Sequence, residues 1–349
     1  MLDDALTMRP GGYDRVATVA ARFAELVDRA QLKLPLPGRG GTAQRWRALA
    51  ELAAEDLDVA RLAEAHLDAL AILQELRQAP TAGPPAPPVR SGQRWAVWAA
   101  EPPNGRVQAE QSADGRWRLT GIKRWCSGAR ACTHALVTAH APDGGRLFAV
   151  DLSSGGVCAG SGGWKGPGMA GSGTEDVEFA AAPAAAVGAP RAYLNRVGFW
   201  YGAIGVAACW YGGAVAIGRP LWEAARGGAL DPHAQAHLGA VDGVLAGAAA
   251  MLRAAAQEAD RAGDPEADDD ASVQLWQRHA LRVRAVVEAA ATTTIERVGR
   301  ALGPSPLATD AAHSRRVTDL TVYLRQSHAE RDLAVLGNLA AGAAGWQLW

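Results

Sequence analysis

The stretch DGRWRLTGIKRWCSGA, residues 114–129, has the pattern of a tight turn followed by a long strand. Asp114-Gly115 is a favourable hairpin turn sequence, and the run after it is rich in aromatic and branched residues. Similar short runs lie on both sides: RWAVWAA, RVQAEQ, HALVTAHA, RLFAVDL and TEDVEF (174–179). About six strands with no helical pattern between them predict an antiparallel barrel or sandwich, which we place at residues 93–190.

The segments that flank this β-domain have the period of helices. Residues 16–30 and 43–78 space apolar residues three and four apart and interleave them with charges, which predicts an N-terminal helical domain over 1–92. The proline-rich linker 79–92 ends it, because proline removes a backbone donor and clashes with the preceding turn. Four long helical runs then predict a C-terminal four-helix bundle over 191–349. They are 197–218, 234–262, 272–301 and 311–339.

The charge balance excludes some classes of partner. Lys and Arg number 35 and Asp and Glu 36, so the net charge is −1 and no bulk field attracts nucleic acid. Val197–Gly218 holds 22 residues without a charge, enough to span a bilayer. We find no second segment of this kind, and therefore favour a helix buried in a soluble bundle over a membrane span. The cysteines show no zinc spacing and the N-terminus no secretory signal, so we expect a bacterial cytoplasmic protein.

Several local patterns carry little functional weight. GPGMAG (166–171) has the glycine spacing of a dinucleotide-binding fingerprint. We expect no such site, because a β-type run rather than a helical pattern follows it. The acidic run 264–270 lacks the spacing of a calcium loop, so we expect no metal site there. Trp95, Trp98, Trp117 and Trp125 lie within 31 positions. Composition alone does not decide whether they fill a core or stack on a flat heterocycle.

Taken in order, these pieces resemble the acyl-CoA dehydrogenase superfamily. DGRWRLTGIKRWCSGA (114–129) is similar to the family's G-x-W-x-L-x-G-x-K-x-W-I-T-N strand pair. GMAGSGTEDVEF (168–179) is similar to its GMRGSGT-x-x-V-x-F segment, and AAEPPNG (99–105) to its LTEPxAGSD turn. VTDL (317–320) is a weaker match to the RDA of the last bundle helix. The resemblance covers about three quarters of the chain, from Trp95 onward.

The resemblance implies a flavoenzyme that binds FAD between the β-domain and the bundle and works as a homo-oligomer, a dimer or a tetramer. It further implies that Trp125 packs on the flavin and that the Ser127 hydroxyl hydrogen-bonds near the flavin N5 atom. The turn that contains Ala99, Ala100, Glu101 and Gly105 would lie beside the pyrimidine ring and the pyrophosphate. The implied reaction is oxidation of the CH–CH group of an acyl thioester or a related substrate.

The catalytic base of the family has no counterpart at either of its known positions. One position corresponds to residues 325–328, which contain no Glu, and the other to Asn195. Glu330 and His328 are the nearest replacements, since a carboxylate or an imidazole with a tuned pKa can act as a base. Two alternatives therefore remain: a flavin-dependent monooxygenase or oxidase on the same fold, and a non-catalytic partner subunit.

Overall fold

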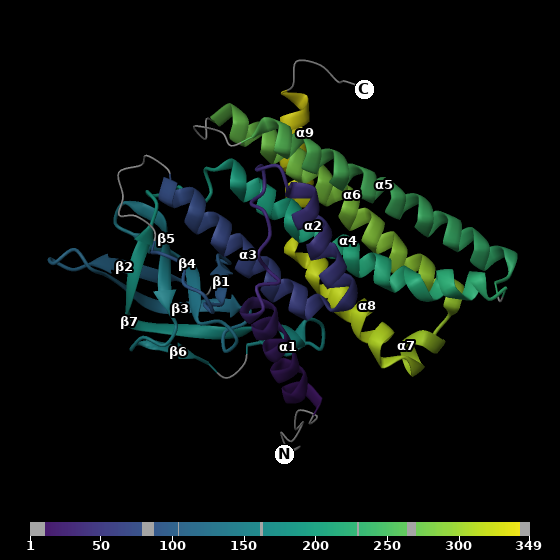
Figure 1. Cartoon of the computed structure of the whole chain (residues 1–349), viewed down its shortest axis with the longest axis horizontal. Coiled ribbons are helices and arrows are strands. Elements are labelled where there is room, and N and C mark those ends of the chain that lie inside the picture. The colour runs from purple at the N-terminus through teal and green to yellow at the C-terminus, as the bar shows by residue number, and fades with distance from the viewer. Residues whose placement is uncertain are drawn as a thin grey trace.

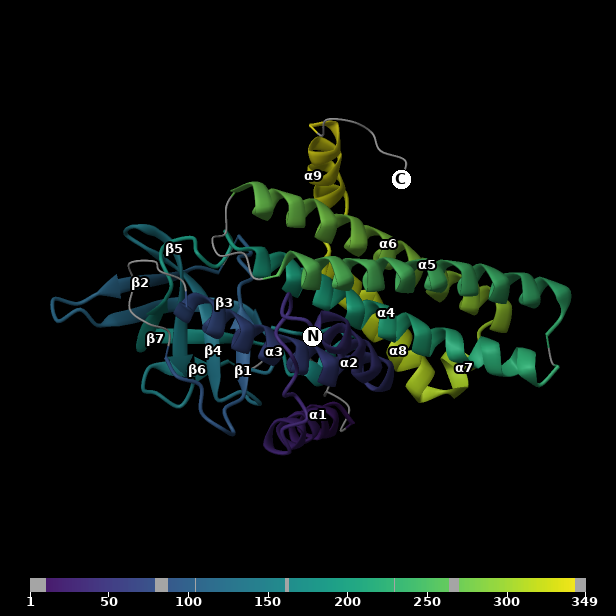
Figure 2. The same cartoon turned by 45° about the horizontal axis from the view of Figure 1, so that its top comes forward.

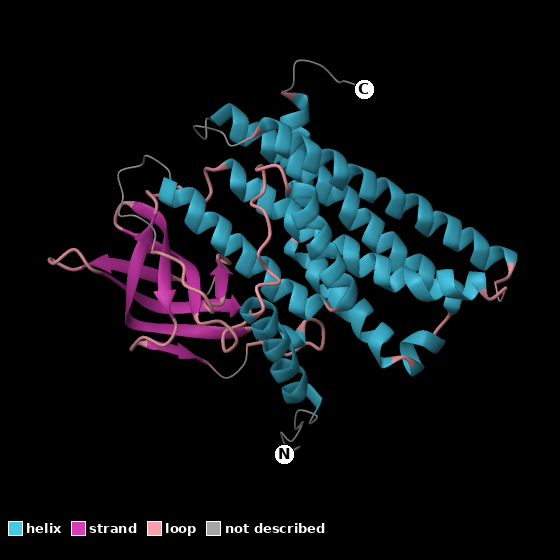
Figure 3. Cartoon of the chain, viewed as in Figure 1, coloured by secondary structure: helices cyan, strands magenta, loops and turns pink. Residues whose placement is uncertain are grey.

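The computed structural model describes residues 11–78, 87–103, 105–160, 163–228, 230–263 and 270–342, with residues 11–14 as backbone only. Within these ranges helices come first, strands follow, and helices return. Figures 1 and 3 show the strands gathered at one end of the molecule and the helices at the other. The predicted mixed architecture of helices and a β-barrel is confirmed. The boundaries between the three predicted domains stay predictions. Residues 79–86 of the linker lie outside the described ranges.

The N-terminal region contains α1 (Gly11–Asp28), α2 (Thr42–Glu55) and α3 (Leu57–Gln78). The single helical run expected over 43–78 is wrong, because the chain breaks at Asp56. Asp56 is extended (φ −158°), and its Oδ1 accepts the backbone N–H groups of Asp58 (3.0 Å) and Val59 (3.3 Å). Asp56 therefore ends α2 and caps the start of α3.

Among its described residues the β-domain has seven strands: β1 (Trp95–Trp98), β2 (Val107–Gln111), β3 (Trp117–Cys126), β4 (His134–Ala141), β5 (Gly144–Asp151), β6 (Val157–Ala159) and β7 (Glu175–Val187). Pairing runs β4-β2-β3-β7-β5 and returns to β4, which closes a barrel, while β6 adds to β7. Leu119, Val137, Phe148 and Phe179 belong to the apolar cluster of the strands and are almost fully buried.

The expectation of a purely antiparallel sheet is wrong. β1 pairs with β4 in parallel, and so does β2, through Gln108 and His140. Both strands lie on the edge of β4 that β5 does not occupy. The remaining ladders are antiparallel, and the Asp114-Gly115 turn joins the β2–β3 pair as predicted.

The uncharged segment forms most of α4 (Val197–Arg226), which packs against α2, α5 and α6. By length and composition two helices could cross a membrane, α4 and α5 (Pro232–Ala262), so the expectation of one such segment is wrong. Burial separates them: 72% of the most apolar window of α4 is buried and only 22% of that of α5. The burial of α4 supports its interpretation as a core helix.

The C-terminal region continues with α6 (Asp270–Leu302), α7 (Ser305–Thr309), α8 (Ala311–Tyr323) and α9 (Glu330–Ala341). One helix over 311–339 is therefore also a wrong prediction. The chain turns at Ala329, which has a left-handed φ of 47°, and Asp332 Oδ2 accepts the backbone N–H of His328 (3.1 Å). Figure 2 shows α9 standing away from the long helices, and no residue of α9 is buried.

Candidate functional site

A tryptophan with a strained backbone lies at the C-terminal end of β3, inside the stretch 114–129. The pairing of β3 with β7 slips between Lys123 and Cys126, and Trp125 in this bulge has a φ of 58°. Such a conformation costs a residue other than glycine about 1–3 kcal/mol. Asp176 on β7 stabilises the bulge, since its carboxylate accepts the Trp125 N–H (3.3 Å) and pairs with Arg124 (3.0 Å). The Trp125 side chain remains 53% exposed.

Ser127 follows this bulge and lies at the start of a row of hydroxyl groups. Its Oγ is 3.0 Å from Thr174 Oγ1, which is 2.9 Å from Ser172 Oγ. The backbone is fixed on both sides: Trp98 Nε1 donates to the Ser127 carbonyl (3.0 Å), and Gly128 N–H donates to the Ser172 carbonyl (2.8 Å). Two of the segments that carry the family resemblance, 114–129 and 168–179, therefore meet here.

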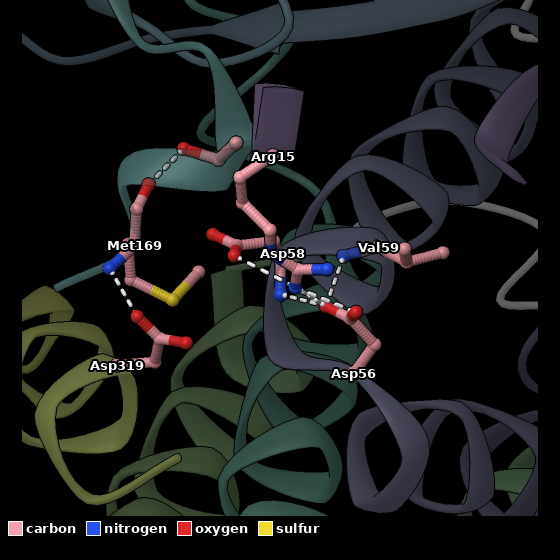
Figure 4. Close-up of polar contacts among 7 residues, drawn as sticks. Arg15, Asp56, Asp58, Val59, Met169 and Asp319 are labelled. Carbon is pink, nitrogen blue, oxygen red and sulfur yellow. Dashed lines mark hydrogen bonds and ion pairs between the residues drawn. The ribbon is translucent and has the colours of Figure 1, made fainter. Parts of the chain in front are cut away.

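The loop that carries Ser172 and Thr174 is anchored to α8. Met169 has a φ of 57°, and its N–H donates to Asp319 Oδ1 at 2.6 Å across 150 positions of sequence. Figure 4 shows this contact beside a second group of acids. The VTDL segment of α8 thus contacts the GMAGSGT loop directly. We predicted each segment separately, but their contact was not predicted.

Two buried carboxyl groups lie at this junction of α1, α3, α8 and the loop. Arg15 Nη2 lies 2.6 Å from Asp56 and 3.1 Å from Asp58, as Figure 4 shows. Asp58 is fully buried, and its Oδ1 has no hydrogen-bond partner among the described residues. Burial and the nearby Asp319 carboxylate raise the pKa of Asp58 to about 7, against the attraction of Arg15. Burial also raises the pKa of Asp319.

The turn predicted to bind cofactor lies beside the same end of β3. Glu101 accepts a hydrogen bond from Thr138 Oγ1 (3.2 Å) and lies 3.8 Å from the buried Lys123 Nζ. Gly105 lies next to the bulge, since an added Cβ there would lie 2.9 Å from Arg124 Cγ. Ala99 is partly buried and Ala100 exposed. Glu101 and Gly105 therefore each have a neighbour on β3, Lys123 and Arg124 respectively.

The two candidate bases lie elsewhere. Glu330 is exposed in the first turn of α9 and lines a cleft of about 450 Å³ between α6 and residues 325–333. His328 is exposed, and its Nδ1 lies 3.3 Å from Asp332 Oδ1. In the described chain no hydrogen bond or ion pair links either side chain to Trp125 or Ser127. The role of a base for Glu330 or His328 stays a prediction.

The interface between α3 and α4 is charged, which sequence reasoning missed. Arg61 pairs with Glu64 at 2.6 Å, and Arg196 pairs with Glu75. Glycines of α4 make room for the acids: an added Cβ at Gly202 would lie 2.6 Å from Asp68 Oδ1, and one at Gly198 would collide with Glu75. Burial, with Asp68 nearby, raises the pKa of Glu64 to about 7 despite Arg61.

A sequence signal for this interface did exist. Charged residues recur at helical spacing on α3, at Arg61, Glu64, Asp68 and Glu75, and glycines recur at a similar spacing on α4. From the sequence we noted only that these charges alternate with apolar residues. Within the described ranges no group of three or more His, Cys, Asp or Glu could hold a metal ion. Residues 264–269 of the acidic run lie outside those ranges.

No sequence family model and no curated protein sequence matches this chain. Solved structures do. The chain is similar to dibenzothiophene monooxygenase TdsC from Paenibacillus sp. A11-2, with 19% identity, a TM-score of 0.74, and 95% and 96% of the two chains covered. It is also similar to methanesulfinate monooxygenase MsuC from Pseudomonas fluorescens (16% identity, TM-score 0.74, 98% of both chains).

A third similar structure is KijD3 in complex with FMN and dTDP-3-amino-2,3,6-trideoxy-4-keto-3-methyl-D-glucose. It has 18% identity and a TM-score of 0.74, and the match covers 97% of this chain and 95% of that one. Identities this low establish the fold alone. Two of these three similar proteins are monooxygenases by name and the third binds FMN in its structure, and this chain has the fold that they share.

Proposed function

We propose that the chain is a flavin-dependent monooxygenase or oxidase that acts on a small molecule other than an acyl thioester. The observation that carries the proposal is the exposed Trp125 indole, held in a strained bulge next to the Ser127 hydroxyl. A strained conformation maintained by neighbouring residues is typical of ligand and active sites. A bound flavin would supply the redox chemistry.

The residues present fit such a cofactor. Trp125 offers a flat apolar surface for an aromatic ring, and Ser127 offers a hydroxyl at its side. Gly105, whose missing side chain keeps the turn close to Arg124, lets the 99–105 backbone approach a ligand. FAD stays our prediction for the cofactor, and FMN, which is bound in the KijD3 complex, is the alternative to test beside it.

One observation argues against an acyl thioester as the substrate. Both base positions of acyl-CoA dehydrogenases lack a carboxylate in this chain, as the sequence shows at Asn195 and at residues 325–328. Oxidation with oxygen as co-substrate does not require that carboxylate.

The test is a titration of the purified chain with FMN and with FAD, oxidised and dithionite-reduced, followed by fluorescence. Trp125→Ala should weaken flavin binding about tenfold, the loss of about 1.4 kcal/mol of stacking. The matched control is Trp222→Ala, because Trp222 of α4 is 49% exposed and lies on another surface. Equal affinities of the two variants would contradict the proposed site.

Two further outcomes distinguish the alternatives. A chain that binds neither flavin would contradict the proposal and leave the non-catalytic partner subunit as the remaining alternative. If flavin binds, anaerobic bleaching by a panel of acyl-CoAs would indicate a dehydrogenase and contradict the proposal, whereas oxygen-dependent turnover of a non-thioester would support it. The homo-oligomer, the cytoplasmic location, and the absence of membrane and nucleic-acid partners stay predictions.

A further inference from the structure

Trp95, the first residue of β1, contacts two histidines from different elements. Its backbone N–H donates to Nδ1 of His66 on α3 at 3.1 Å. Its indole lies against the imidazole of His134, the residue that pairs with it on β4, with 4.7 Å between the ring centroids. Trp95 is 1% exposed and His66 4% exposed, so water does not compete for these contacts.

These contacts join α3 to the β-domain. Among the described strands β1 pairs only with β4, so His66 supplies an acceptor that a second strand would otherwise offer to the Trp95 N–H. Apolar side chains of α3 and of the strands pack around this bond; they include Ala69, Ile72, Leu73, Leu136, Leu147 and Val187. We call Trp95, His66 and His134 the Trp95 joint.

Counting hydrogens fixes the protonation state of His66 in the closed joint. A backbone N–H can only donate, so the Nδ1 atom that accepts it carries no hydrogen, and the one hydrogen of the neutral ring lies on Nε2. A second proton on His66 would bind at Nδ1 and face the Trp95 N–H, donor against donor. The N–H is fixed to the strand and cannot turn away, so a charged His66 is incompatible with this bond.

The same count holds for His134. The Gln93 side-chain oxygen accepts the N–H of Arg90 (2.8 Å) and the indole N–H of Trp95 (3.3 Å), which fixes the orientation of the amide. Gln93 Nε2 therefore donates to His134 Nε2, 3.0 Å away. The His134 hydrogen then lies on Nδ1 and donates to Thr133 Oγ1 (2.9 Å). A proton added at Nε2 would face the Gln93 N–H.

The surroundings of both rings oppose a positive charge. The charged groups that face them come from α2, from the segment before β1 and from β5; they are Arg45, Arg90, Arg94 and Asp151. Burial, helped by Arg45 and Arg94, lowers the pKa of His66 from 6.5 to about 4. Burial also lowers the pKa of His134, against the attraction of Asp151.

The direction of the pH effect follows from these pKa values. Once the joint opens, water reaches the rings and their ordinary pKa of about 6.5 returns. The closed joint therefore binds fewer protons than the open one. Its stability is fully present above pH 6.5 and is lost as the pH falls through 6.5 toward 4.

We propose that the Trp95 joint is an acid-sensitive device that releases α3 from β1 while the barrel stays folded. The barrel stays closed because the core between its strands is built from apolar side chains such as Phe148 and Phe179, which take up no proton. The device lies outside the proposed flavin site and does not depend on a bound cofactor.

Hydrogen–deuterium exchange of the purified full-length chain, resolved to single amides at pH 7.5 and 5.0, tests the proposal. Each rate is divided by the intrinsic rate at the same pH, which gives the opening constant of that amide. The shift of the His66 pKa predicts that the opening constant of the Trp95 N–H rises about thirtyfold between these pH values, and further as His134 is protonated. The Phe148 N–H, on a residue that pairs with both β4 and β7, should keep its opening constant.

Two variants assign the effect to the histidines. His66→Asn keeps an acceptor oxygen near the place of Nδ1 but takes up no proton, so the rise at the Trp95 N–H should shrink about thirtyfold. His134→Gln should remove the remainder. His313→Asn is the matched control, because His313 is also a buried histidine, 2% exposed, but lies on α8. It should leave the rise at Trp95 unchanged.

Three results would overturn the proposal. The first is an opening constant of the Trp95 N–H that is equal at the two pH values, and the second is a full thirtyfold rise in His66→Asn. The third is an equal rise at Trp95 and Phe148, which would show unfolding of the whole chain. If His66→Asn fails to fold, the wild-type comparison of Trp95 with Phe148 and the His134→Gln variant decide. Flavin binding enters none of these measurements, so each result leaves the proposed function untouched.

Discussion

Replacing Asp58 with asparagine should remove a pH-dependent penalty on folding. The pKa of Asp58 is raised from an ordinary value of 3.8 to about 7 by burial and by Asp319, with Arg15 acting in the opposite direction. The folded chain therefore binds more protons than the unfolded chain between these values. It follows that the stabilising contribution of the proton is fully present below pH 3.8 and is lost as the pH rises to about 7.

The magnitude follows from the size of the shift. Three pKa units correspond to about 4 kcal/mol. Because the site can relax around a charge, we expect about 2–4 kcal/mol in the measured difference, with a slope of up to about 1.4 kcal/mol per pH unit in mid-window. Wild type and Asp58→Asn should have similar free energies of unfolding at pH 4. At pH 8 the variant should be the more stable by this amount.

Urea unfolding of both proteins at pH values from 4 to 8 measures this difference. Comparing the two curves cancels other groups that titrate in the window, including Glu64. Asp242→Asn is the control, because Asp242 is exposed on α5. Parallel curves for wild type and Asp58→Asn would refute the reasoning. A variant less stable at pH 8 would show that the Arg15 attraction outweighs the cost of burying the charge.

Three further predictions concern other parts of the molecule. Gly202→Ala should lower the free energy of unfolding by about 1–3 kcal/mol, because its Cβ would press on Asp68. Gly239→Ala on α5 has open space around the added Cβ and should raise the free energy of unfolding by up to about 1 kcal/mol. Thermal unfolding of both variants measures the difference. Burial, with Arg45 and Arg94, lowers the pKa of His66 from 6.5 to about 4, and its Nδ1 accepts the Trp95 N–H (3.1 Å). Folding stability from His66 is therefore lost as the pH falls from 6.5 to about 4, and His66→Asn should flatten the acid side of the unfolding curve by about 2–3 kcal/mol. If Glu330 is the base, Glu330→Gln should abolish substrate turnover while flavin affinity, measured by fluorescence, stays at the wild-type value; undiminished turnover would remove Glu330 from the mechanism.

The local features of the fold could be predicted because neighbours in sequence determine them. The Asp114-Gly115 turn leads into β3 as predicted, with Gly115 at a φ of 82°. The uncharged segment forms a helix that is mostly buried. The helix break at Asp56 was missed because a single aspartate in a charged, periodic run looks like one more solvated position. Its role as a cap depends on where α3 must point.

The candidate site could be predicted only in pieces. Trp125, Ser127 and the GMAGSGT segment were identified through the resemblance, but no spacing rule gives the order in which Ser127, Thr174 and Ser172 meet. The packing of Asp68 and Glu75 against α4 was missed for a related reason. A charged residue on a helix faces water unless another element covers it, and here α4 covers these two acids at Gly202 and Gly198, more than 120 positions later in the sequence.

The bond between Met169 and Asp319 also sets an order of assembly. Contacts between residues far apart in sequence form late, because a long loop must close before they contribute stability. Residues 95–187 contain every described strand, so the barrel has its full set of strands well before Asp319 leaves the ribosome. The GMAGSGT loop acquires its Asp319 anchor only once α8 has been synthesised and docked. A chain stalled before α8 would thus hold every described strand but lack the bond that anchors this loop.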